Sequence, residues 1–135
     1  MKTTRTLNGG LLAVGGAIIV TVSLAGTGEG QGSSQGVAID ADDLGGVVTG
    51  PKGPESGVWV IAETTELPTR FAKIVVTDDR GRYVVPDLPK ATYNVWVRGY
   101  GLVDSPKTPA PPGKTLNLTA VVAPDERTAA RVYPA

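Results

Sequence analysis

The chain has 135 residues, enough for one domain of ordinary size, and its 13 basic and 13 acidic residues cancel. This balance, without a basic patch, argues against a nucleic-acid partner, and the lack of Cys and His excludes disulfides and removes the usual ligands of zinc or haem. Eighteen glycines and eleven prolines among many Val and Thr residues favour short strands joined by turns. The composition predicts an all-β protein without a cofactor.

The first 25 residues have the form of a secretory signal peptide. Lys2 and Arg5 precede an apolar run at 11–25, and Ser23-Leu24-Ala25 places small residues where a signal peptidase cleaves. The run is about 15 residues long, shorter than the roughly 20 of a membrane-spanning helix. We therefore expect residues 1–25 to be removed and the protein to be periplasmic or extracellular, with no stable membrane span. An uncleaved anchor is the alternative.

The rest of the chain divides into three parts. Residues 26–42 are predicted to form a flexible Gly/Ser-rich linker, because residues 26–36 contain no apolar side chain. A folded module follows at 43–124. In the C-terminal segment 125–135, Asp125 is a suitable N-cap for a short helix that must dock to be stable. If the working protein continues beyond this chain, the module would be an accessory domain of a larger exported enzyme.

Apolar residues return with period two from Val37 onward, and turn signals separate them. An Asp-Arg-Gly turn, in which Gly81 can adopt the left-handed conformation, joins two of the expected strands. Seven strands are predicted, at 46–49, 58–63, 71–77, 82–85, 93–98, weakly near Lys107, and at 115–122. This pattern is typical of a β-sandwich.

Several motifs then occur in an order that resembles a known family. They are Gly46-Val47-Val48, Gly57-Val58-Trp59-Val60, Thr77-Asp78-Asp79-Arg80-Gly81-Arg82-Tyr83, Leu88-Pro89-Lys90-Ala91-Thr92-Tyr93-Asn94-Val95 and Arg98-Gly99-Tyr100-Gly101. Over roughly residues 43–124 the chain is similar to the carboxypeptidase regulatory-like domain, although Lys90-Ala91-Thr92 replaces the family's Pro-Gly turn. The resemblance implies a seven-stranded Greek-key, transthyretin-like β-sandwich. It also implies an accessory module without catalytic residues.

Strand alternation predicts a candidate binding surface. If Val58, Val60 and Ala62 point into the core, as Tyr93, Val95 and Val97 do, the intervening residues point outward. The candidate surface consists of Trp59, Ile61, Glu63, Asn94, Trp96 and Arg98. In the topology that the resemblance implies, the two strands are neighbours, so we expect Trp59 and Trp96 to form an exposed pair.

Three interpretations of this pair stay open. The linker, the Pro-rich loop or the C-terminal segment covers it; a protein partner in the envelope or outside the cell binds it; or a polysaccharide stacks on it. We expect a non-catalytic binding or structural module with a protein partner, and a carbohydrate-binding module is the alternative.

The acidic and nucleophilic residues carry weaker hypotheses. Weak calcium candidates are Asp40, Asp42, Asp43, Asp78 and Asp79, although their spacing matches no calcium loop and Asp is common in turns. Ser56 and Ser105 have no His to act as a base, so we do not expect an enzyme. An isopeptide bond between Lys73 and Asn117 is a minor alternative.

Overall fold

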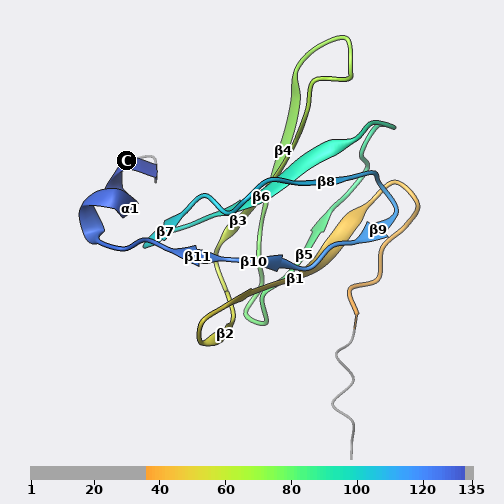
Figure 1. The fold of residues 1–135 in the computed structure, drawn as a ribbon. Helices are drawn as coiled ribbons and strands as arrows, with labels where there is room; N and C mark the ends of the chain where they lie inside the picture. Colours follow the sequence, from red (N-terminus) through yellow and green to blue (C-terminus); the bar gives the residue numbers. More distant parts are fainter. Residues whose placement is uncertain (1–35, 133–135) are drawn as a thin grey trace, which may run out of the picture. The chain divides into compact units, whose positions relative to one another are not determined.

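The computed structural model describes residues 36–132 (Figure 1). The described part is mostly β-structure with one short helix. Its strands are β1 (Leu44–Gly50), β2 (Gly53–Pro54), β3 (Trp59–Thr64), β4 (Phe71–Val76), β5 (Arg82–Val85), β6 (Tyr93–Arg98), β7 (Leu102–Val103), β8 (Thr108–Ala110), β9 (Lys114–Thr115), β10 (Leu118–Thr119) and β11 (Val121–Val122), and its helix is α1 (Glu126–Val132). The all-β class is confirmed.

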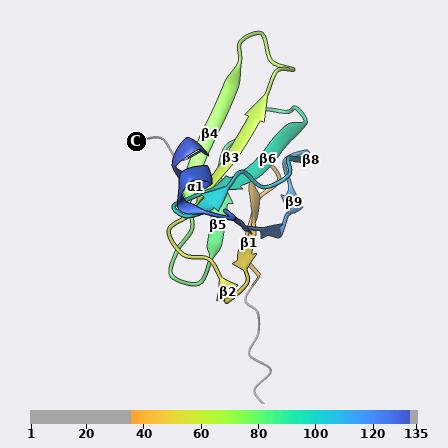
Figure 2. The ribbon, with the colours of Figure 1, turned by 60° about the vertical axis from the view of Figure 1, so that its left-hand side comes forward.

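One sheet contains four antiparallel strands in the order β4-β3-β6-β8 (Figure 2). In its central register Ile61 lies opposite Trp96 on one side and opposite Ile74 on the other. β3, β4 and β6 are rich in Val, Ile and aromatic residues, which fit a pleated and half-buried surface. The central strands start and end within one residue of their predicted positions.

The second large sheet is built around β1, which pairs with β2 and β5 in the antiparallel sense and with β9 and β10 in the parallel sense. The single strand predicted at 115–122 is wrong, because β9, β10 and β11 replace it. Between the two parallel contacts, the N–H of Val47 donates to the Asn117 side chain at 3.0 Å instead of to a backbone carbonyl. A Cβ on Gly46 would lie 2.1 Å from the Leu116 oxygen, so only glycine allows this crossing.

Both large sheets contribute to one hydrophobic core. β1, β5 and β10 supply Leu44, Val48, Tyr83, Val85 and Leu118, and the four-stranded sheet supplies Val60, Ala62, Tyr93, Val95, Val97 and Ala110. Phe71 packs edge-on against Tyr93, with ring centroids 6.2 Å apart. The Tyr83 hydroxyl donates to the Leu116 carbonyl and therefore joins β5 to the segment between β9 and β10. The predicted inward residues of β3 and β6 are confirmed.

The turn between β4 and β5 has the predicted form. Gly81 has a φ of 72°, and the Asp78 carboxylate accepts backbone hydrogen bonds from Arg80 and Arg82, both at 2.9 Å. These N–H groups, that of Arg82 above all, hold the pKa of Asp78 below its usual value. Asp78 thus has a structural role in the turn.

The ends of the described part differ from each other. Asp125 caps α1, since its carboxylate accepts the N–H of Thr128 at 2.7 Å, and this bond lowers the pKa of Asp125.

At the N-terminal end of the described residues, Val37 and Ile39 are half-buried and lie close to Gly45, although the predicted linker extends to residue 42. The predicted signal peptide lies outside the described residues. Within 36–132 no helix has the length and apolar character needed to cross a membrane.

Candidate functional site

The candidate residues lie together on the side of the four-stranded sheet that faces away from the core, which we call the outer face. The register places Trp59 opposite Arg98 and Glu63 opposite Asn94. All six predicted residues alternate with core residues of β3 and β6. Strand alternation therefore assigned them to the correct face.

The expectation of an exposed tryptophan pair is wrong for Trp96. Its exposed fraction is only 6%, and that of its cross-strand neighbour Ile61 is 5%. The Lys107 ammonium lies 4.1 Å from the centre of the Trp96 ring and covers it with a cation–π contact. Trp59 is half-buried and lies diagonally across the strands from Trp96. Lys107, which covers Trp96, comes just before the Pro-rich loop. This agrees in part with the interpretation that the linker, the Pro-rich loop or the C-terminal segment covers the tryptophan pair.

β4 extends the apolar surface with two residues that the sequence analysis missed. Ile74 lies opposite Ile61, and Val76 lies opposite Trp59. Their exposed fractions are 55% and 56%, so they are the open part of the outer face. Nearly every residue of β4 is apolar, and its own alternation therefore did not indicate which side faces the core.

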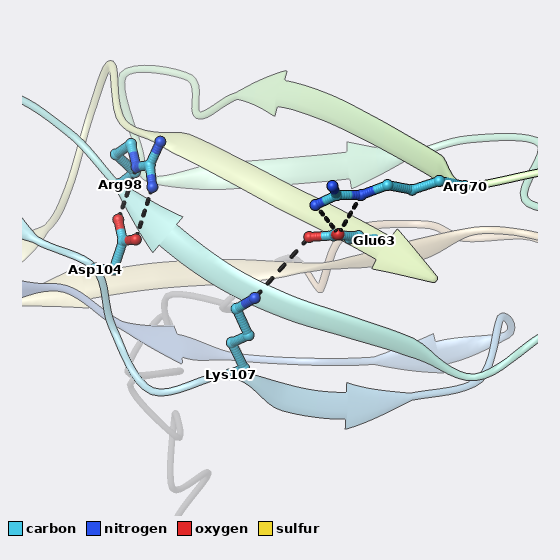
Figure 3. A network of polar contacts seen from close by, with 5 residues as sticks. All are labelled: Glu63, Arg70, Arg98, Asp104 and Lys107. Atoms are coloured by element: carbon cyan, nitrogen blue, oxygen red, sulfur yellow. Dashed lines mark hydrogen bonds and ion pairs between the residues drawn. The ribbon is translucent and has the colours of Figure 1, made fainter. Parts of the chain in front are cut away.

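Ion pairs border this apolar surface at both ends (Figure 3). At one end the Glu63 carboxylate accepts from Arg70 Nε at 2.8 Å, and Lys107 Nζ lies 3.9 Å from the same carboxylate. At the other end Arg98 forms a two-bond pair with Asp104, with both distances 2.7 Å, and this contact raises the pKa of Arg98. An apolar centre with a charged rim is the usual anatomy of a protein-binding surface.

One polar atom of the outer face is unsatisfied. The indole nitrogen of Trp96 is buried and has no hydrogen-bond partner among residues 36–132. An unpaired buried donor costs about 1–3 kcal/mol. Trp96 therefore contributes apolar contacts without the hydrogen bond that a buried indole normally makes.

The two groups of predicted calcium candidates, at 40–43 and at 78–79, do not converge. Asp78 and Asp79 lie at one end of the β1–β5 ladder, whereas Asp40, Asp42 and Asp43 lie at the other. The structure instead groups the carboxylates of Asp42, Asp43 and Asp87 within 4.8 Å. The Asp43 carboxylate accepts the N–H groups of Asp40 and Asp87, so its position is explained by the local turns.

The nucleophile and isopeptide hypotheses gain no supporting geometry. The Ser105 hydroxyl accepts the N–H of Val97 at 2.9 Å. Lys73 Nζ donates to the Pro86 carbonyl at 2.6 Å, whereas the Asn117 side chain accepts from Val47. Each of these side chains therefore supports the backbone of a neighbouring segment.

Two surface hollows lie away from the candidate residues. One, of about 640 Å³, lies between α1 and the turn before β7 and is lined by Tyr100, Gly101, Ala123, Asp125, Glu126, Ala129 and Ala130. The other, of about 270 Å³, lies between residues 36–38 and β5. Small-molecule sites are usually concave, and neither hollow includes a residue of the outer face.

No known family model matches the chain. A comparison with curated proteins likewise finds no similar protein.

Proposed function

We propose that this chain is a non-catalytic, exported module that binds a protein partner with the outer face of its four-stranded sheet. The observation that carries the proposal is the exposure of Ile74 and Val76 beside Trp59. Large apolar side chains that adjoin on a surface favour association with another protein, and the ion pairs of Arg98 and Glu63 resemble the polar rim of such an interface.

The resemblance noted in the sequence is part of the same proposal. The strand order β4-β3-β6-β8 and the pairing of β1 with β5, β9 and β10 are consistent with a seven-stranded, transthyretin-like Greek-key sandwich. Domains of that family are accessory modules, which supports a binding role over an enzymatic one. The apolar run at 11–25 supports export to the periplasm or the extracellular space.

The covering of Trp96 favours a protein partner over a polysaccharide. A sugar platform needs an open aromatic face, whereas the Lys107 ammonium occupies the space over the Trp96 ring. The polysaccharide alternative predicts that the chain is retained on a polysaccharide matrix and that Trp59→Ala abolishes retention. Equal retention of the unchanged chain and of Trp59→Ala would rule out the polysaccharide alternative.

Capture experiments test the proposal directly. The full chain, immobilised and incubated with the envelope or medium of its source, should retain a specific protein that Trp59→Ala and the double variant Ile74→Ser/Val76→Ser lose. The matched control is Val121→Ser/Val122→Ser, which removes two exposed valines from β11. If the face variants and the control retain the same proteins as the unchanged chain, the outer face is not the binding surface.

A further inference from the structure

β4 is an edge strand with a free backbone. It pairs with β3, and no other strand of residues 36–132 pairs with its opposite side (Figure 2). The N–H of Thr77 donates to Val58 and its carbonyl accepts from Gly57, so the backbone groups of Thr77 point toward the β3 side. Because these directions alternate along a strand, the N–H and C=O groups of Ala72, Ile74 and Val76 point away from β3. These groups form a row of donors and acceptors that is suited to another strand.

Within residues 36–132, the β4 edge has fewer of the features that protect a sheet edge than the β8 edge has. Sheet edges are commonly blunted by proline, short length, bulges or charge. β8 has three residues and contains Pro109, while β4 pairs with β3 through six consecutive residues without a bulge or proline. The only charged residue of β4 is Lys73, which donates to the Pro86 carbonyl.

We propose that two copies of this chain associate through their β4 edges, antiparallel to each other and related by a twofold axis at Ile74. In this register Ile74 lies opposite Ile74 of the second copy, and Ala72 lies opposite Val76. Each of these pairs exchanges both backbone hydrogen bonds, because the groups that pair are those that point away from β3. The side chains that meet on the outer face are all apolar. The two outer faces become one continuous surface.

Charge favours this register over one centred on Lys73, and it does not oppose pairing with a second copy. Extended beyond the strand, the register brings Arg70 of one copy to the level of Asp78 of the other, so residues of opposite charge lie at the same level at both ends. Within its own copy, Arg70 is paired with Glu63 and Asp78 with Arg82. A register centred on Lys73 would instead place Lys73 opposite itself, and like charges in direct cross-strand contact are destabilising. The formal net charge of the full chain is zero, and without residues 1–25, which hold two basic residues and no acidic one, it is 11 − 13 = −2, so general repulsion between two copies is small.

Cysteine cross-linking of the full chain tests the pairing and its register. The sequence contains no Cys, so a single introduced thiol is unique. In Ile74→Cys the two Cα atoms would be about 5.5 Å apart, which suits a disulfide, and mild oxidation should give a covalent dimer. Ala72→Cys should not cross-link to itself, since the two Ala72 positions would be about 14 Å apart. Val122→Cys is the control for random collision, because Val122 is similarly exposed on β11.

Sedimentation equilibrium provides the second measurement. The full chain should be dimeric at sub-millimolar concentration, and Ile74→Lys should weaken the dimer by about tenfold or more, because it places lysine opposite lysine. Circular dichroism of this variant should be unchanged, since the Ile74 side chain is mostly exposed.

A monomer at every concentration, or cross-linking of Ile74→Cys no greater than that of Val122→Cys, would overturn the proposal. Cross-linking of Lys73→Cys in place of Ile74→Cys would overturn the register. Neither outcome decides whether the outer face binds a protein partner. The capture experiment with Trp59→Ala tests that proposal separately, because this variant alters β3 and not the β4 edge.

Discussion

The two faces of the four-stranded sheet are both apolar, but they are covered in different ways. On the inner face, Val60, Val95 and Val97 are fully buried because the second large sheet packs over them. On the outer face, the Lys107 side chain covers Trp96, while Ile74 stays largely exposed. The core thus accounts for the inner apolar residues, and the outer ones call for another explanation. Binding a partner is the explanation proposed above.

The largest expected effect is on the inner face. Tyr93→Ala should lower the free energy of unfolding by about 3–5 kcal/mol, because it removes a buried ring that packs on Phe71. Tyr93→Phe should lose only about 1 kcal/mol, since it removes just the hydrogen bond to the Pro89 carbonyl. Urea unfolding of both variants measures the difference. Similar losses for the two would contradict the assignment of the ring to the core.

A smaller effect is expected for the buried residue of the outer face. Trp96→Ala should lower the free energy of unfolding by about 2 kcal/mol, less than a core aromatic, because Lys107 rather than a packed sheet covers the ring. Trp96→Phe should lose less than about 1 kcal/mol, since it also removes an unpaired buried N–H. If Trp96→Ala is as harmful as Tyr93→Ala, the outer face is a second core and not a covered surface.

High pH should lower the stability of the fold through a buried tyrosine, Tyr83. Burial raises the pKa of Tyr83 above the reference value of 10.0. The neutral phenol is therefore favoured in the folded state, and its contribution to stability is complete below pH 10 and is lost as pH rises toward the folded pKa. Tyr83→Phe should cost about 1 kcal/mol at neutral pH and reduce this alkaline loss.

Part of the alkaline loss should remain in Tyr83→Phe, because burial and the nearby Glu66 also raise the pKa of Tyr93. Thermal unfolding of both proteins from pH 7 to 11 measures the effect. An identical pH dependence for the two proteins would show that Tyr83 does not contribute.

The smallest effect should follow from uncovering Trp96. Lys107→Ala removes the cation–π contact and should cost about 0.5–1 kcal/mol. Acrylamide should then quench the tryptophan fluorescence more strongly. Lys114→Ala is the control, because Lys114 is an exposed lysine on β9. Equal quenching of the two variants would show that Lys107 does not protect the ring.

The sequence predicted the faces of the strands better than their surroundings. Alternation identified both sides of β3 and β6 correctly, and these central strands began and ended within one residue of the predicted positions. Alternation cannot show, however, which residues cover a face of the sheet. Lys107, which covers Trp96, lies 11 residues after it along the chain. The contact that buries Trp96 depends on the pairing of β6 with β8, which the local pattern does not specify.

The C-terminal strands were mispredicted for a related reason. A run of alternating apolar residues at 115–122 indicates one strand, but here β9 and β10 pair in parallel with β1. At Val47 the Asn117 side chain accepts the hydrogen bond that a backbone carbonyl would otherwise accept. This interruption depends on a contact between the Asn117 side chain, which lies between β9 and β10, and the backbone of β1, so the pattern of residues 115–122 alone does not reveal it.

The most direct test of the outer-face proposal uses the only two tryptophans of the chain, Trp59 and Trp96, both of which lie on that face. The full chain, labelled with 5-fluorotryptophan, should give two ¹⁹F resonances, which Trp59→Phe and Trp96→Phe assign. Adding the unlabelled protein recovered by capture should shift the Trp59 resonance, because the partner covers the region beside Ile74 and Val76. Formation of the complex with both resonances unchanged would contradict the proposal.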